Sequence, residues 1–378
     1  MKQEGAESAL LVSIDFGDAD YRESLEELRL LAKTAGVRVE SVVEARRSRP
    51  DAALFVGSGK ADEIADLVTS MEISLVIFNH DLTPAQMRNL TARLNARVID
   101  RTMLILDIFA QRAQSHEGKV QVELAQLKYL ATRLVGSHAD MGQQKFAVGA
   151  RGPGETQLEL DRRKLDRRVH LLKERLEKLK AQRNVQRRFR NRKNAYSVSI
   201  VGYTNAGKST LFNRLTKANV YAANQLFATL DTTSRKMYIE GEGEIVLSDT
   251  VGFIRHLPHG LVAAFRSTLE ETAQADLLLH VVDASNAEHE NQIAEVNKVL
   301  AEIGAGEIPQ VLVFNKIDMT DRQAGVERDE YGRIARIFLS AKNGAGLDEL
   351  RLALSEARKI AALQIENLNE RETSHGIE

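Results

Sequence analysis

The segment Gly202–Ser209, with the sequence GYTNAGKS, restricts the fold of this 378-residue chain more than any other feature. It matches the pattern of a glycine, four residues, a second glycine, a lysine and a serine or threonine. An apolar run precedes it over Ser197–Val201, and a helical pattern follows over Lys208–Thr216. A loop between a strand and a helix can wrap phosphate oxygens with its backbone N–H groups, so this context predicts a phosphate-binding loop.

The region around this loop alternates apolar runs with helical patterns. The predicted strands are Ser197–Val201, Glu244–Ser248, Asp276–Asp283, Pro309–Phe314 and Ile337–Leu339. The predicted helices are Lys208–Thr216, Leu261–Ala273, Ala287–Ile303 and Leu347–Ala361. Such alternation is typical of a doubly wound α/β domain. We place a P-loop nucleotide-binding domain at residues 195–364 and a short polar C-terminal tail at residues 365–378.

Two neighbouring motifs predict magnesium-dependent phosphate binding. In the loop, Lys208 reaches the β- and γ-phosphates and the Ser209 hydroxyl ligates Mg²⁺. The sequence Asp249-Thr250-Val251-Gly252 stands at the end of the next strongly apolar strand. There Asp249 would hold Mg²⁺ through its second coordination shell, and the Gly252 amide would contact the γ-phosphate.

Two later motifs indicate which base is bound. Asn315-Lys316-Ile317-Asp318 ends another predicted strand. A carboxylate at Asp318 accepts hydrogen bonds from N1–H and the exocyclic N2 of guanine, and adenine lacks both donors. Ser340-Ala341-Lys342 follows the last strand and would support the guanine O6 through backbone amides. Four motifs in order, each at the carboxyl end of a predicted strand, indicate GTP and GDP as the ligands.

The first switch offers three threonines as the second protein ligand of Mg²⁺. Thr229 is favoured, with Thr232 and Thr233 as alternatives. We assign catalytic roles to Lys208, Thr229 and Gly252. The predicted nucleotide contacts are Gly202, Tyr203, Thr204, Asn205, Ala206, Gly207, Lys208, Ser209, Thr210, Phe227, Ala228, Thr229, Leu230, Asp231, Asp249, Thr250, Val251, Gly252, Asn315, Lys316, Ile317, Asp318, Ser340, Ala341 and Lys342.

Two residues bear on the rate of hydrolysis. Phe253 stands where Ras-like enzymes carry the glutamine that orients the attacking water, so intrinsic hydrolysis should be slow and need a partner. Asn205 matches a position that ligates a monovalent cation in potassium-stimulated GTPases, although an asparagine there can also simply brace the loop. Ligation of K⁺ is therefore one of two possible roles for Asn205, and bracing of the P-loop is the other.

The first 113 residues predict a small, largely parallel α/β domain. The predicted strands are Leu10–Ile14, Val37–Val43, Leu54–Val56, Leu75–Phe78 and Val98–Ile99, and the predicted helices are Tyr21–Ala35, Ala61–Ser70 and Pro84–Leu94. Thr83 should cap the third helix, with Pro84 in its first turn. Gly57–Lys60 resembles a phosphate loop but has Leu54 in place of the first glycine and Ala61 after the lysine, so we predict a turn.

Residues 114–194 predict an antiparallel helical hairpin. Apolar residues recur with coiled-coil spacing in two stretches, which are Val120, Leu124, Leu127, Ala131 and Leu134, and then Leu158, Leu165, Val169, Leu172, Leu176 and Leu179. Such a pattern needs a partner helix. Each stretch can serve the other, which gives a monomer, or the same surface can form a dimer. The loop between them, Gly136–Thr156, is rich in glycine.

Composition limits the chemistry, the cellular location and the partners that we expect for the protein. Cysteine is absent, which excludes disulfides, thiolate catalysis and Cys-ligated metal. No secretory signal or membrane-spanning run is visible, so we expect a cytoplasmic protein without stable membrane insertion. Residues 151–194 carry 16 Lys or Arg against 6 Asp or Glu, although the whole chain has a net charge of −1. That segment is either a polyanion-binding surface or a solvated helix face.

Several segments resemble the HflX-type GTPases, which belong to the translation-factor class of P-loop GTPases. They are Asn79–Arg101, Leu104–Phe109, Glu117–Leu127, Gly152–Glu159, Asp249–Pro258 and Ala264–Glu271. The resemblance covers residues from about 10 to about 360. Two departures are that Thr232 stands where the family often has proline, and that we expect no counterpart of the small C-terminal domain of longer relatives.

The resemblance implies a factor that binds the large ribosomal subunit near the peptidyl-transferase centre and splits stalled or idle ribosomes, often under stress. It also implies Mg²⁺ as a cofactor, and contacts with ribosomal RNA rather than DNA. By that analogy the ribosome-facing residues are Arg151, Gly152, Gly154, Arg183, Arg187 and Arg188. The alternatives are a regulatory GTPase that binds the subunit without splitting ribosomes, and a ribosome-assembly GTPase.

Overall fold

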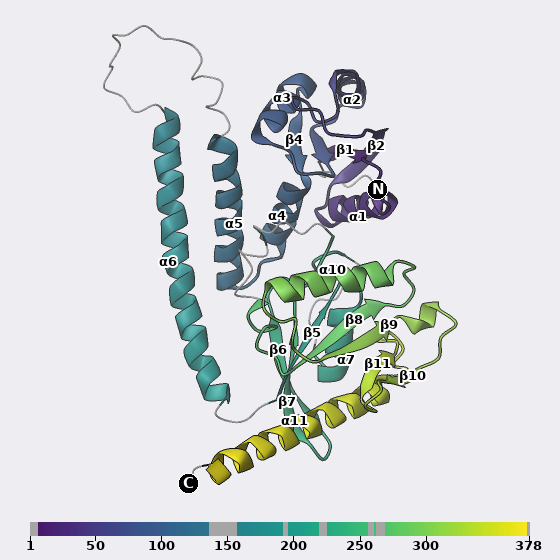
Figure 1. Cartoon of the computed structure of the whole chain (residues 1–378). Coiled ribbons are helices and arrows are strands. Elements are labelled where there is room, and N and C mark those ends of the chain that lie inside the picture. Colours follow the sequence, from purple (N-terminus) through teal and green to yellow (C-terminus); the bar gives the residue numbers. More distant parts are fainter. Residues whose placement is uncertain are drawn as a thin grey trace. The chain divides into compact units, whose positions relative to one another are not determined.

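The computed structural model describes residues 7–135, 157–191, 196–218, 225–255, 261 and 269–375 (Figure 1). The chain divides into two compact units. One contains residues 1–180 and 258–264, and the other contains residues 181–257 and 265–378. Within the described part of the chain, no helix is both long enough and apolar enough to cross a bilayer.

The first unit has the predicted parallel α/β architecture, with a four-stranded sheet in the order β2-β1-β3-β4. Its strands are β1 (Ser8–Asp15), β2 (Arg38–Arg46), β3 (Leu75–Phe78) and β4 (Arg97–Asp100). Its helices are α1 (Tyr21–Thr34), α2 (Ser58–Ser70), α3 (Pro84–Leu94) and α4 (Arg101–Arg112). Leu10, Val12 and Phe78 are fully buried in its core because both faces of a parallel sheet are covered.

Two local predictions for this unit were wrong, and one helix was missed. Leu54–Val56 is not a strand, because Phe55 makes only an isolated bridge to Asp51 and has a positive φ of 63°. Its apolar side chains are buried without pairing, which the sequence pattern alone does not distinguish from a strand. The turn predicted over Gly57–Lys60 is the start of α2, which begins at Ser58. The helix α4 was not predicted.

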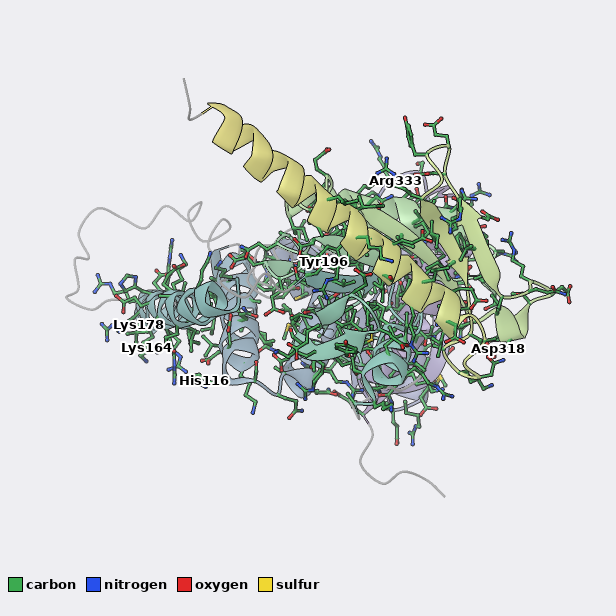
Figure 2. All side chains as sticks on the ribbon, turned by 90° about the horizontal axis from the view of Figure 1, so that it is seen from below. His116, Lys164, Lys178, Tyr196, Asp318 and Arg333 are labelled. Carbon is green, nitrogen blue, oxygen red and sulfur yellow. The ribbon has the colours of Figure 1, made fainter. Side chains whose placement is uncertain are left out.

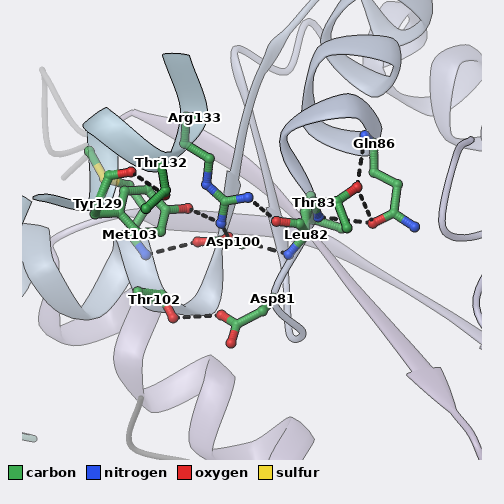
Figure 3. A network of polar contacts seen from close by, with 10 residues as sticks. All are labelled: Asp81, Leu82, Thr83, Gln86, Asp100, Thr102, Met103, Tyr129, Thr132 and Arg133. Atoms are coloured by element: carbon green, nitrogen blue, oxygen red, sulfur yellow. Dashed lines mark hydrogen bonds and ion pairs between the residues drawn. The ribbon is translucent and has the colours of Figure 1, made fainter. Parts of the chain in front are cut away.

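The Thr83 cap is confirmed, and a second cap ties the sheet to a later helix. Thr83 and Gln86 form a reciprocal capping box with Pro84 in the first turn of α3. Asp100 caps α4 by accepting a hydrogen bond from the Met103 amide at 2.9 Å. Its other oxygen accepts from Arg133 at 2.7 Å (Figure 3). Asp100 therefore fixes the end of β4 against the helix that carries Arg133.

That helix, α5 (His116–Val135), forms an antiparallel hairpin with α6 (Gln157–Asn191), as predicted (Figure 1). The predicted apolar positions meet, with Val120, Leu124 and Leu172 buried and Leu127, Val169 and Leu176 packed beside them. Arg168 and Glu123 form an ion pair at 2.6 Å across the two helices. The predicted loop Gly136–Thr156 lies outside the described residues.

The second unit has a seven-stranded sheet in the order β10-β11-β9-β8-β5-β7-β6. Its strands are β5 (Tyr196–Gly202), β6 (Thr233–Ile239), β7 (Gly243–Asp249), β8 (Leu277–Asp283), β9 (Gln310–Asn315), β10 (Gly325–Arg328) and β11 (Ile334–Phe338). Its described helices include α7 (Lys208–Thr216), α10 (His289–Glu302) and α11 (Leu347–His375). The five central strands are parallel, so the predicted doubly wound fold is confirmed.

Two edge strands and one helix end differ from the predictions. β6 and β10 were missed, and each pairs antiparallel at an edge of the sheet. Edge strands bury few side chains, so their apolar signal is weak. The predicted helix Leu347–Ala361 continues as α11 to His375, through most of the segment expected to be a polar tail. Most of the predicted helix Leu261–Ala273 lies outside the described residues.

Candidate nucleotide-binding site

A pocket of ≈ 590 Å³ opens beside the P-loop of the second unit. Its wall is built by the P-loop, the first switch and the segments that follow β7, β8, β9 and β11. The lining residues are Thr204, Asn205, Gly207, Lys208, Ser209, Thr210, Gln225, Phe227, Ala228, Thr229, Thr250, Gly252, Asp283, Ser285, Asn315, Lys316, Asp318, Met319, Ala341 and Lys342. This is where a doubly wound sheet binds ligands, beyond the carboxyl ends of its strands.

Gly207 fits a position that no other residue can occupy. Its φ of +95° lies in the left-handed region that L side chains rarely adopt. A Cβ atom there would lie 2.2 Å from the Asn315 side-chain nitrogen. That nitrogen donates a hydrogen bond of 2.8 Å to the Ala206 carbonyl, which ties the P-loop to the end of β9. The close approach of these two segments therefore depends on the glycine.

Lys208 is buried at the N-terminus of α7. Its ammonium donates a hydrogen bond of 2.7 Å to the Tyr203 carbonyl. Burial lowers the pKa of Lys208 to about 8, and the nearby Asp249 carboxylate opposes that shift. A phosphate group placed beside this ammonium would therefore stabilise its charged form strongly.

Ser209, Thr229 and Asp249 come together from three separate segments. The Ser209 hydroxyl lies 2.7 Å from Asp249 Oδ2 and 2.7 Å from the Thr229 hydroxyl. Thr229 also donates to Asp249 Oδ2 at 3.0 Å. Of the two alternative threonines, Thr232 directly precedes β6, and Thr233 opens β6 in register with Asp249. The favoured threonine is thus the one that the structure brings to the cluster.

The same cluster has the chemistry of a magnesium site. Mg²⁺ prefers oxygen ligands, and the cluster presents two hydroxyls and a carboxylate. Asp249 Oδ1 is buried and has no hydrogen-bond partner within the described part of the chain. Burial raises the pKa of Asp249 above its usual range, and hydrogen bonds from Ser209 and the charge of Lys208 oppose the shift. A cation with its bound water would compensate both the buried charge and the unpartnered oxygen.

The residues after β9 and β11 form a second end of the pocket. Asn315 accepts a hydrogen bond of 2.9 Å from the Ala341 amide, so the two predicted base-binding motifs are joined. Asp318 Oδ1 accepts from the Ser340 hydroxyl at 2.6 Å. Lys316 forms an ion pair of 2.6 Å with Asp283. These contacts hold the carboxylate of Asp318 at the pocket, where a guanine base could meet it.

The segment after β7 is paired with the P-loop. The Phe253 amide donates to the Gly202 carbonyl at 3.2 Å, and the Thr204 amide donates to the Phe253 carbonyl at 2.7 Å. Phe253 is only 1% exposed, and its ring has no hydrogen-bonding group that could orient a water molecule. The pairing places Gly252 beside the P-loop.

Three family models together match most of the chain between residues 22 and 316. Residues 22–110 match a model described as "GTP-binding GTPase N-terminal", and residues 112–190 match one described as "GTP-binding GTPase Middle Region". Residues 197–316 match a model described as "50S ribosome-binding GTPase". A GTPase HflX of Escherichia coli K12 is 54% identical over 356 residues, which are 94% of this chain and 84% of that protein.

The chain belongs to the HflX family of GTPases. A GTPase HflX of Caldanaerobacter subterraneus is 47% identical over 92% of this chain and 80% of its own length. The crystal structure of a protein named SsGBP in complex with GDP has a TM-score of 0.52 and 26% identity, and it covers 94% of this chain and 99% of that one. As an HflX-family protein with a P-loop GTPase fold, the chain binds GTP and GDP and hydrolyses GTP, with the Mg²⁺ use that is general for this fold.

Most of the predicted nucleotide contacts line the pocket, and the others do not. The predicted contacts that are not among the lining residues are Gly202, Tyr203, Ala206, Leu230, Asp231, Asp249, Val251, Ile317 and Ser340. The lining residues that were not predicted are Gln225, Asp283, Ser285 and Met319. Asp283 could have been predicted, because it ends the predicted strand Asp276–Asp283, which neighbours the strands that lead to the other motifs. Arg151, Gly152 and Gly154 lie outside the described residues, as do the side chains of Arg183, Arg187 and Arg188.

Proposed function

We propose that this HflX-family GTPase associates with the large ribosomal subunit and uses GTP to split stalled or idle ribosomes. The observation that carries the proposal is the match of residues 197–316 to the model described as "50S ribosome-binding GTPase". The Escherichia coli GTPase HflX is similar over 94% of the chain, so the proposal concerns both units.

Within the pocket, each polar group has a proposed role. Lys208 and the P-loop amides bind the β- and γ-phosphates, and the Gly252 amide binds the γ-phosphate. Ser209 and Thr229 ligate Mg²⁺, and Asp249 holds it through a bound water. When bound, the ion neutralises developing charge on the phosphates. Asp318 selects guanine.

The geometry supports a switch driven by the γ-phosphate. Thr229 and Gly252 lie on either side of the β6–β7 hairpin, and Thr229 is hydrogen-bonded to Ser209 and Asp249. A ligand that occupies this cluster exchanges those internal bonds for bonds to Mg²⁺ and phosphate. Order in both switch segments then depends on the nucleotide, which is the usual basis of GTPase switching.

Hydrolysis by the protein alone should be slow, and the ribosome should accelerate it. Phe253 supplies no group for the attacking water, and Asn205 is an exposed P-loop residue that lines the pocket. We include in the proposal that the Asn205 side-chain oxygen holds K⁺ beside the phosphates. Replacing K⁺ by Na⁺ should then lower turnover, with little change in nucleotide affinity.

The described part of α6 supports a contact with ribosomal RNA. Arg162, Arg167 and Lys178 are exposed, and the side chains of this helix, Lys164 and Lys178 among them, project outward along it (Figure 2). Phosphate groups of folded RNA bind such arrays through salt-dependent contacts. The helix belongs to a segment of residues 151–194 with 16 basic and 6 acidic residues.

The test measures GTP turnover with and without purified large subunits, together with light scattering of intact ribosomes. Strong stimulation with a loss of scattering is expected. Stimulation without loss of scattering would favour a regulatory binder, and no stimulation would contradict the ribosome proposal.

A variant with Arg162→Glu, Arg167→Glu and Lys178→Glu should lose about tenfold of the stimulation, because phosphate contacts dominate such binding. The matched control is Arg333→Glu with Arg336→Glu, on and beside β11, which should retain it. If both variants lose stimulation equally, α6 is not the contact surface.

A further inference from the structure

Thr204 is the P-loop residue that packs against Gly252. A Cβ atom added to Gly252 would lie 2.7 Å from the Thr204 methyl carbon and 3.0 Å from the Lys208 ammonium nitrogen. The methyl group and the ammonium therefore flank the same point. The Thr204 backbone is also fixed there, because its amide donates to the Phe253 carbonyl.

The hydroxyl of Thr204 makes no hydrogen bond within the part of the chain that the structure describes. The residue is only 6% exposed, and its Oγ1 has no hydrogen-bond partner among the described residues. A buried hydroxyl without a partner destabilises the fold. One staggered rotation of the side chain about χ1 would move Oγ1 to the place that the methyl group occupies, beside Gly252 and Lys208.

This place lies where the proposed nucleotide site puts the γ-phosphate, and the residue after Gly252 supplies no polar group for the water. A glutamine after the glycine of the second switch orients the attacking water in Ras-like enzymes, whereas Phe253 has no polar atom. A threonine hydroxyl can accept one hydrogen bond and donate another at the same time. We propose that the Thr204 hydroxyl takes over this task and positions the attacking water for GTP hydrolysis.

In the reaction, the oxygen of the water forms a bond to the γ-phosphorus. The bond from that phosphorus to the β–γ bridging oxygen breaks, and GDP leaves with the electron pair. One proton of the water passes to a γ-phosphate oxygen, which gives inorganic phosphate. Thr204 accepts a hydrogen bond from the other water hydrogen and donates its own to a γ-phosphate oxygen, and it neither gains nor loses a proton.

The inference rests on the proposed placement of the γ-phosphate at Gly252, and two substitutions isolate the hydroxyl. Thr204→Val keeps the shape and removes the hydroxyl, whereas Thr204→Ser keeps the hydroxyl and removes the methyl group. Single-turnover hydrolysis without ribosomes should slow about 10- to 100-fold in Thr204→Val, as when one transition-state hydrogen bond is removed. Thr204→Ser should stay within about threefold of the unsubstituted protein. Thr91→Val, at an exposed threonine of α3, is the control for the substitution itself.

A second measurement separates positioning from structure. GDP with aluminium fluoride imitates the phosphoryl group in transfer, so Thr204→Val should weaken binding of this complex by the same factor as the rate. Its affinity for GDP alone should not change. A Thr204→Val protein that hydrolyses GTP normally, or a Thr204→Ser protein that is equally slow, would overturn the inference.

Loss of GDP binding in Thr204→Val would also overturn the inference, because the hydroxyl would then serve the fold or the ground state. If the unsubstituted protein bound neither GDP nor the aluminium fluoride complex, the nucleotide site itself would be wrong. Neither measurement involves ribosomes, so the ribosome proposal is tested separately.

Discussion

The two sheets of this chain treat the polar groups at the carboxyl ends of their parallel strands in different ways. At the N-terminal sheet, Arg101 binds Asn79 at 2.9 Å and also forms a buried ion pair with Glu27. At the GTPase sheet, Asp249 keeps one buried oxygen without a partner in the described part of the chain, and Lys208 turns to a backbone carbonyl. At the first sheet the Arg101 charge is paired with a carboxylate of the same unit, whereas the second sheet leaves one oxygen of Asp249 without a partner in the described part of the chain.

The two glycine–lysine loops show the same contrast. Gly57 and Gly207 both have positive φ angles and each precedes a helix. A Cβ at Gly57 would lie 2.4 Å from an Arg47 guanidinium nitrogen, so an arginine already occupies the space above that glycine. Lys60 pairs with Glu63 at 2.6 Å, on the same helix. Similar loop sequences therefore become a packed helix start in one unit and a phosphate site in the other.

The largest effect is expected from matched substitutions of these glycines. Gly207→Ala places a methyl group against Asn315 at a φ that alanine rarely adopts. GTP affinity should fall about 1000-fold, which corresponds to about 4 kcal/mol. Gly57→Ala should cost about 1 kcal/mol of stability and leave GTP affinity unchanged. Titration calorimetry with GTP measures the GTP affinity of both variants. An equal loss of affinity in the two would remove the contrast.

The internal charges of the N-terminal sheet should matter for stability alone. Glu27→Ala leaves the buried Arg101 charge without its carboxylate and should lower the free energy of unfolding of this unit by about 3 kcal/mol. Chemical denaturation measures that loss. Turnover of GTP by the folded protein should stay the same, and a proportional fall in turnover would show that the two sheets are coupled.

Base selection should change when one side-chain oxygen of Asp318, just after β9, is replaced by nitrogen. Asp318→Asn replaces an acceptor by an amide donor, so guanine loses one hydrogen bond and meets a repulsive contact at N2. GTP affinity should fall about 100-fold, and xanthosine triphosphate, which carries an acceptor at that place, should bind better than GTP. Competition against a fluorescent GDP analogue tests this, and unchanged preference would place the base elsewhere.

The smallest effect concerns His280, which is buried in β8. Burial lowers its pKa to about 4, and the charge of Lys208 contributes, while the Gln310 side chain opposes the shift. The unfolded chain takes up a proton near pH 6.5 and the folded chain does not, so stability falls as the pH drops below about 6.5. The free energy of unfolding should fall by about 2 kcal/mol between pH 7 and 5 from this residue. His280→Gln should remove that part of the pH dependence.

The motifs of the GTPase site could be predicted because each one fixes its own chemistry within a few residues. Lys208, Asp249 and Asp318 follow strands, and strand ends meet at one edge of a parallel sheet, so their convergence followed from the topology. β6, β10 and the end of α11 could not be predicted, because their pairing and length depend on distant segments. Thr229 needed the structure, since three threonines stand within five residues and only their contacts distinguish them.

Hydrogen exchange of the full chain, with and without Mg²⁺ and a non-hydrolysable GTP analogue, tests the contrast between the two sheets most directly. We expect slower exchange of the backbone amides of Thr204–Ser209 and Gly252, and no change at Gly57–Ala61 or Arg101–Met103. Protection at the ends of the N-terminal strands, with none at the P-loop, would contradict it.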